Sequence, residues 1–135
     1  LKINEISSNI PFVSNDDKIQ DQNLGLTIQV NTDNIQILTG TPSRPYKTIS
    51  RVANGGYDLE QLRAELISLK KIHPKEMTAL LEPVADITYE ELVNIMDNIR
   101  ETKNTDDTIY TKDEKGLDIQ TNQLFSNIVF TNIRS

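Results

Sequence analysis

Residues 85–100, ADITYEELVNIMDNIR, place several carboxylates, a tyrosine and a methionine at helical spacing. Carboxylates gathered in this way suggest acid–base catalysis or metal binding. Catalysis by paired carboxylates requires two acids that face one cleft at a controlled separation. Nothing in the sequence sets a second acid opposite Asp86 or Asp97, so the pattern argues against a hydrolase that would use either aspartate.

Other catalytic and metal-binding chemistries lack residues that they need. His73 is the only histidine, it precedes Pro74, and it has no metal-ligating partner at helical spacing. A lone histidine also argues against a catalytic triad. Residues 106–118 lack the spacing of a calcium-binding loop, and the absence of cysteine excludes thiolate chemistry. We therefore predict no catalytic residue, no metal site, no cofactor and no enzymatic activity.

Local helix physics accounts for most polar residues of this stretch. Thr88 and Glu91 have the T-x-x-E spacing of a capping box. Asp86 and Glu90 lie near the expected start of the helix, where the positive end of the helix dipole favours carboxylates. Asp97 lies on the flank of the apolar stripe and has no such explanation.

The apolar residues of the same stretch predict one buried helix face. They recur every three or four residues, as Leu92, Ile95, Met96 and Ile99. Tyr89 lies three residues before Leu92, and we expect its ring to be buried while its hydroxyl reaches a polar rim.

Length and charge limit the class of protein. A chain of 135 residues suits one domain with a modest core. The net charge of −6 argues against nucleic-acid binding, which needs concentrated lysine and arginine. The sequence has no Walker-type or G-x-G-x-x-G loop. It also has no run of about 18 apolar residues, so we expect no segment of it to span a bilayer.

The first part of the chain predicts a polar leader and then a β-hairpin. Residues 1–23 are interpreted as a flexible linker, in which Ile10 and Pro11 form an extended docking or tethering element. Residues 24–30 alternate apolar and polar side chains as a half-buried strand does. Residues 35–38 resume the alternation after a turn.

Residues 39–57 are interpreted as a long loop, because they contain two prolines and a Gly-Gly pair. The loop carries three cations, Arg44, Lys47 and Arg51, and no acid. One interpretation is a surface loop without a role. The other is a contact site for an anionic surface or an acidic partner.

The second part of the chain predicts a helix at 58–72, a short buried strand at 77–84, the helix described above, and a final strand at 124–133. Between the last two elements, residues 101–123 form a polar connection with room for a short hairpin. The element order predicts an α+β domain over residues 24–135, with a mixed sheet of about four strands and both helices on one face.

The stretch 85–100 resembles the signature of the ExbD/TolR family. In that family an Ala-Asp pair precedes a tyrosine, and a Val-x-(Val/Ile)-Met-Asp run with a nearby basic residue follows. The matching residues are Asp86, Tyr89, Val93, Met96, Asp97 and Arg100. Residues 26–37 and 58–69 resemble the first hairpin and first helix of the family, and residues 9–11 resemble its Leu-Pro element.

This resemblance implies the periplasmic domain of a single-pass inner-membrane protein, whose membrane helix carries a proton-conducting aspartate and would precede this chain. Family members form a motor with a pentameric ExbB/TolQ-type subunit. Their periplasmic domain dimerises and passes the energy of the proton gradient to a TonB- or TolA-like protein, or contacts peptidoglycan. The 39–57 and 101–123 connections are longer than the family usually has, which leaves an ExbD-like and a TolR-like role both open.

An exposed edge strand is the expected contact for a partner peptide or a second copy of the chain. The two candidates are residues 26–30 and the final strand, and we favour the latter for self-pairing, through Asn127, Ile128, Val129 and Phe130. The alternative hypothesis is a generic α+β adaptor or ligand-binding domain whose resemblance to the family is local.

Overall fold

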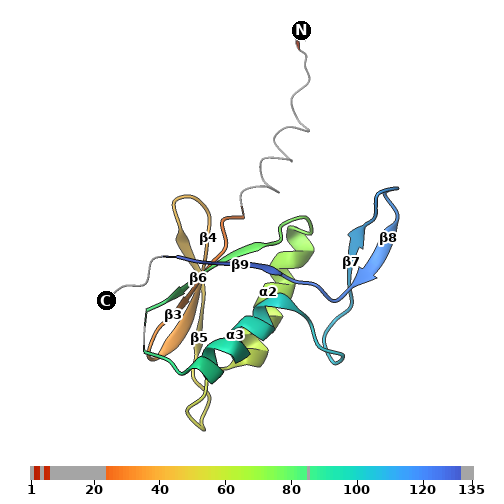
Figure 1. Ribbon diagram of the computed structural model, residues 1–135. Coiled ribbons are helices and arrows are strands. Elements are labelled where there is room, and N and C mark those ends of the chain that lie inside the picture. The colour runs from red at the N-terminus through yellow and green to blue at the C-terminus, as the bar shows by residue number, and fades with distance from the viewer. Residues whose placement is uncertain (1, 4, 7–23, 85, 132–135) are drawn as a thin grey trace.

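The computed structural model describes residues 2–3, 5–6, 24–84 and 86–131 (Figure 1). Its elements are β1 (Lys2–Ile3), β2 (Glu5–Ile6), β3 (Thr27–Val30), β4 (Asn34–Thr39), β5 (Arg44–Ser50), α2 (Leu59–Ile72), β6 (Thr78–Pro83), α3 (Tyr89–Arg100), β7 (Ile109–Lys112), β8 (Asp118–Thr121) and β9 (Asn127–Phe130). The expected α+β class is confirmed. The docking element at Ile10 and Pro11 lies outside the described residues.

One mixed sheet organises the domain, with the strand order β5-β4-β3-β6-β9. β3 pairs antiparallel with β4, and β4 with β5, whereas β3 and β6 are parallel, as are β6 and β9. The prediction that residues 26–30 form an edge is therefore wrong, because β3 has a neighbour on each side. Alternating side chains are typical of any strand with one buried face, central or not.

β5 corrects the prediction of a long loop at residues 39–57. Only Ile49 of this strand is buried, so its sequence lacks the regular apolar alternation that marks a strand. Pro45 also argued against a strand, but proline is tolerated at a sheet edge, where one side of the backbone needs no partner. The sheet consequently has five strands, one more than expected.

Both helices cover the same face of the sheet, as predicted (Figure 1). α2 connects β5 to the parallel strand β6, and α3 connects β6 to β9, so both crossovers proceed in the same direction across the sheet. Crossovers of this kind are almost always right-handed, which places successive helices on one side. The core between these layers includes Ile28, Val30, Ile35, Ile37, Leu62, Leu66, Leu81, Ile95, Ile99 and Phe125.

Side-chain caps begin both helices where the sequence predicts. The Asp58 carboxylate accepts a hydrogen bond of 3.1 Å from the Gln61 main-chain N–H. Thr88 and Glu91 form both bonds of the capping box. Each cap satisfies main-chain groups that the first turn leaves without a helical partner.

A hairpin of β7 and β8 extends from the layered body (Figure 1), within the connection predicted at 101–123. Its base is attached through the buried Ile109 and through a buried arginine of α2. The Arg63 side chain is 4% exposed, and it donates to Asp106 and to Asn98 at 2.5 Å each. The guanidinium thus joins α2, α3 and the start of the hairpin connection.

We expect Arg63→Met to lower the free energy of unfolding by about 3 kcal/mol, because removal of the buried guanidinium leaves the Asp106 carboxylate without its countercharge. Lys71→Met is the matched control: its pair with Asp107, at 3.2 Å, is exposed. The control should cost less than about 1 kcal/mol. Urea unfolding measures both, and equal losses in the two variants would contradict the anchoring role of Arg63.

The same pair predicts a dependence of stability on pH. The hydrogen bond from Arg63 lowers the pKa of Asp106 below its ordinary value of 3.8. A lowered pKa in the folded state contributes stability above the unfolded pKa, and this contribution is lost as the pH falls through the folded pKa. Asp106→Asn should therefore lose less stability than the wild type on acidification, in urea titrations at decreasing pH. Asp107→Asn is the control and should follow the wild-type profile.

Candidate protein-binding site

The outer edge of β9 is available for pairing. β9 pairs with β6 on one side, and no strand of the described residues pairs with its other side. The main-chain N–H groups of Asn127 and Thr131 donate to Met77 and Leu81, on the β6 side, at 2.9 and 3.0 Å. Because main-chain groups alternate in direction along a strand, the N–H and C=O groups of the intervening residues 128 and 130 point to the free edge.

This edge carries none of the features that normally block strand pairing. Residues 124–131 contain no charge and no proline. Val129 is 42% exposed and Phe130 is 46% exposed. The opposite edge, β5, instead carries Pro45 and Lys47, which are typical devices against edge-to-edge association. The two edges of the sheet therefore differ, and β9 is the one that favours an added strand.

An apolar groove lies beside the β9 edge. Its volume is about 360 Å³, and its lining residues come from α3 and from the end of β9: Tyr89, Leu92, Val93, Met96, Arg100 and Phe130. Phe130 belongs to both features, because its side chain lines the groove while its backbone forms part of the edge. The groove and the edge thus form one continuous surface.

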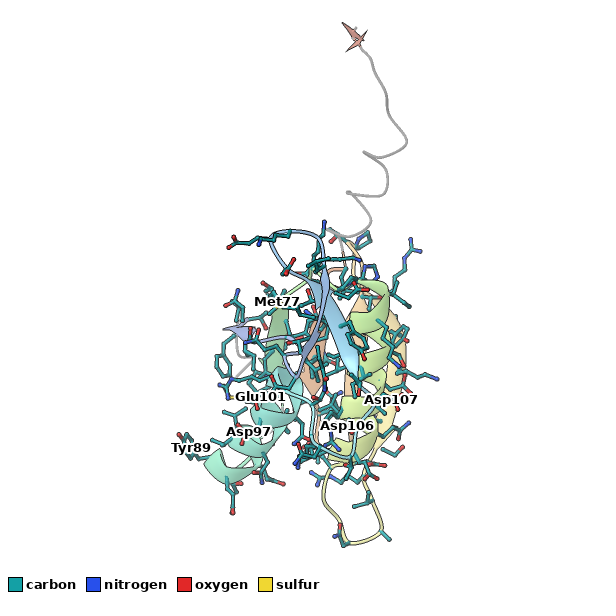
Figure 2. All side chains as sticks on the ribbon, turned by 90° about the vertical axis from the view of Figure 1, so that its right-hand side faces the viewer. Met77, Tyr89, Asp97, Glu101, Asp106 and Asp107 are labelled. Atoms are coloured by element: carbon teal, nitrogen blue, oxygen red, sulfur yellow. The ribbon has the colours of Figure 1, made fainter. Side chains whose placement is uncertain are left out.

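Tyr89 corrects a sequence prediction. Its ring is 82% exposed rather than buried (Figure 2). Tyr89 is the first residue of α3, and the part of the helix that packs on the core begins with the next turns, where Ile95 and Ile99 are fully buried. No element of the described residues covers the ring, so Tyr89 belongs to the groove.

The groove, which was not predicted, corresponds to a recognisable pattern in the sequence. Residues 89, 92, 93, 96 and 100 follow a second helical stripe, rotated relative to the one that faces the core. Val93 belongs to this second stripe alone. The expected apolar stripe at residues 92, 95, 96 and 99 is confirmed, with Leu92 and Met96 half-buried between the two faces.

Exposed carboxylates lie along α3 and at its two ends, beside the residues that line the groove. Asp86, Glu90 and Asp97 are exposed at and within the helix, and Glu101 follows it. Asp97 forms an exposed ion pair of 3.3 Å with Arg100. Figure 2 shows Tyr89, Asp97 and Glu101 along this part of the molecule. Because this ion pair is exposed, it gives Asp97 only a weak structural role.

The predicted basic residues do not join this site. Arg44 and Lys47 are exposed on β5, at the other edge of the sheet. Arg51 has a structural role: its Nε donates to the Thr32 carbonyl at 2.7 Å, and its guanidinium lies 4.0 Å from the centre of the Tyr57 ring. The structure therefore separates the two groups of residues proposed as contacts.

Two other kinds of site were sought in the structure. Across residues 2–3, 5–6, 24–84 and 86–131, no three histidine, aspartate or glutamate side chains converge closely enough to hold a metal ion. Neither α2 nor α3, the helices of the described part of the chain, is long and apolar enough to cross a membrane.

The chain was compared with models of known protein families, with curated proteins and with solved structures, and none of these comparisons gives a match.

The geometry of the site suits the binding of an extended segment. A segment added along β9 would form main-chain hydrogen bonds with residues 128 and 130, and alternate side chains of the segment would face the helix layer. One apolar side chain on that side would enter the groove beside Met96 and Phe130. A second copy of the chain, paired antiparallel through its own β9, would satisfy the same edge around a two-fold axis.

We expect Asp97→Asn to change the free energy of unfolding by less than about 0.5 kcal/mol, because the pair with Arg100 is exposed to solvent. Ile95→Ala, two residues away on the buried face of the same helix, should cost about 3 kcal/mol. Urea unfolding of both variants measures the difference. A loss in Asp97→Asn close to that of Ile95→Ala would show that this aspartate supports the fold.

Proposed function

We propose that this chain is a non-enzymatic protein-binding domain that accepts an extended protein segment along β9. The observation that carries the proposal is the unprotected β9 edge beside an apolar groove. Main-chain hydrogen bonds to the edge supply affinity without regard to sequence. The groove adds selectivity, because it rewards an apolar side chain at one position of the bound segment.

The negative charge near the groove indicates a further property of the bound segment. Asp86, Glu90, Asp97 and Glu101 are exposed near a groove whose lining contains one cation, Arg100. Complementary charge steers association and excludes partners of like charge. A suitable segment therefore combines apolar residues at alternate positions with lysine or arginine nearby.

The resemblance of residues 85–100 to the ExbD/TolR signature supports a role for this binding activity in a larger assembly. In the proposed function the chain is the periplasmic domain of a stator or coupling subunit anchored in the inner membrane. It passes the energy of the proton gradient from an ExbB/TolQ-like subunit to a TonB- or TolA-like partner, or to peptidoglycan. The β9 edge is then the contact for that partner or for the second subunit of a homodimer.

The residues of the signature have different positions with respect to this contact. Tyr89, Met96 and Arg100 line the groove. Asp86 and Asp97 are exposed on the same helix, and Asp97 orients Arg100 through their ion pair. Under the proposal these residues serve recognition, since the fully buried apolar residues of the helix are Ile95 and Ile99.

A pair of variants at one position tests the edge. Phe130→Pro removes the outward N–H of residue 130 without removing a hydrogen bond of the β6–β9 ladder, whereas Phe130→Ala removes the same ring and keeps the N–H. A photoreactive residue at the exposed Ser126 of the full-length protein, in its own membranes, reports contacts at the edge. We expect the crosslinked product to be lost in the proline variant and retained, at reduced yield, in the alanine variant.

Collapse of the proton gradient with a protonophore separates the two parts of the proposal. Crosslinking that changes when the gradient collapses supports energy coupling. Crosslinking that is unaffected by the protonophore contradicts the coupling role, and equal yields in the proline and alanine variants contradict strand addition at β9.

A further inference from the structure

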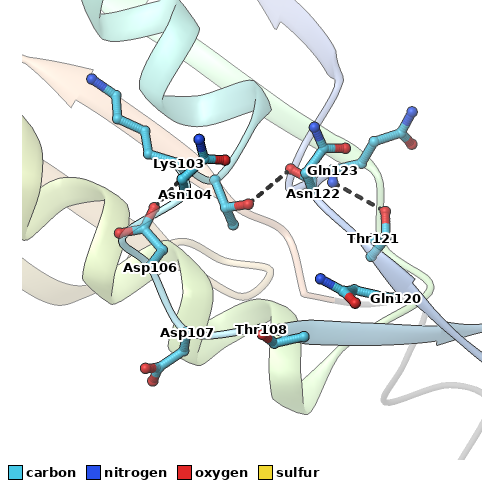
Figure 3. Close-up of a pocket in the computed structure, with 10 residues that line it drawn as sticks. Lys103, Asn104, Asp106, Asp107, Thr108, Gln120, Thr121, Asn122 and Gln123 are labelled. Carbon is cyan, nitrogen blue, oxygen red and sulfur yellow. Dashed lines mark hydrogen bonds between the residues drawn. The ribbon is translucent and has the colours of Figure 1, made fainter.

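A second hollow lies at the base of the β7–β8 hairpin, on the connection that is longer than the ExbD/TolR family usually has (Figure 3). Its volume is about 460 Å³, within the range of small-molecule sites. Two stretches of chain form it, residues 102–108 before the hairpin and residues 120–123, which comprise the end of β8 and the two residues after it. The hydrogen bond from the Thr102 N–H to the Asn122 carbonyl, at 2.8 Å, holds the two stretches together.

The two acids of this hollow are already neutralised. Asp106 is paired with the buried Arg63 at 2.5 Å and also accepts from the Lys103 main-chain N–H at 2.6 Å. Asp107 is paired with Lys71. The Lys103 ammonium points away from the amide side chains of the hollow (Figure 3). Both acids of the hollow therefore have a basic partner within the chain, and the lysine is not directed at the amide side chains.

Neutral hydrogen-bonding side chains form the rest of the lining. Besides Thr102 and Thr121, whose hydroxyls form hydrogen bonds within the chain, they are Asn104, Thr108, Gln120, Asn122 and Gln123. All five are exposed, and within the described part of the chain none of their side chains has a hydrogen-bond partner. Each amide presents a donor and an acceptor side by side, and a hydroxyl both donates and accepts. Such a lining is suited to a ligand whose own groups donate and accept in neighbouring pairs.

An exposed aromatic ring adjoins these amides. Tyr110 pairs directly with Gln120 across the hairpin, so the two side chains share one face. The Tyr110 ring is 59% exposed. Packing within the described residues does not account for a large aromatic side chain at this position. The ring provides an apolar face next to the polar hollow.

We propose that this face of the hairpin and the adjoining hollow bind a neutral oligosaccharide. Neighbouring hydroxyls of a sugar match the paired donor and acceptor of Gln120 and Asn122, and the C–H face of the ring packs on Tyr110. An anion would need a cation directed into the hollow, whereas the Lys103 ammonium points away from its amides (Figure 3). A metal ion would need carboxylates that are not already paired with Arg63 and Lys71. The proposal is independent of the β9 edge, because none of its residues lines the α3–β9 groove.

The test is a titration of the isotopically labelled 135-residue chain with cellotetraose and with chitotetraose, followed by the amide resonances of backbone and side chains. At least one of the two should shift resonances of residues 102–108 and 120–123, with a Kd in the millimolar range. Tyr110→Ala and Asn122→Ala should each weaken that binding about tenfold, which corresponds to about 1.4 kcal/mol. Spectra of the variants away from the hairpin report whether the fold is kept.

Tyr46→Ala is the matched control, since Tyr46 is an exposed tyrosine on β5, and it should bind as the wild type does. The proposal is overturned if neither oligosaccharide shifts resonances of the hollow, or if Tyr110→Ala and Tyr46→Ala bind equally well. It is also overturned if the neutral peptide tetra-alanine produces the same shifts, because the hollow would then recognise peptide amides.

Discussion

The covering of one sheet face by two helices is the constraint on which the rest of this structure depends. Ile28, Val30, Ile37 and Leu81 lie at the centre of that face and are fully buried. Five strands are wider than two helices, and burial falls toward the β9 edge: Ile128 is half-buried and Phe130 is 46% exposed. The groove between α3 and β9 is a direct result of this mismatch in width. The candidate binding site is therefore located where the core of the domain ends.

Much of this architecture follows from sequence periodicity, because buried faces impose it. The alternation of residues 24–30 and the capped, amphipathic stretches at 58–72 and 85–100 each correspond to an element of the structure. Periodicity describes one element at a time, however, and says nothing about its neighbours. It does not distinguish a central strand from an edge, which is why residues 26–30 were misplaced. It cannot recognise β5, which pairs with one strand and buries only Ile49.

The candidate site was predictable only in part, because periodicity does not show which elements are neighbours. The final strand was one of two candidate edges, and it is the one that the structure places at an edge of the sheet. Tyr89 was assigned to the core because helical spacing shows which side chains share a face, and not whether another element covers that face. The buried Arg63 was also beyond prediction, since its partners, Asn98 and Asp106, lie 35 and 43 residues away in the sequence.

The parallel ladder between β6 and β9 has a mechanical consequence. Its hydrogen bonds run across the strand axes, between a strand at the sheet edge and its inner neighbour. Traction along a segment bound at that edge would load the bonds of the ladder in shear, so that they resist together instead of opening one after another. The force would then pass through β6 to β3, in the middle of the sheet. There the buried side chains of both strands belong to the same core as those of the helices. A small domain with this strand order is suited to bear tension along its edge.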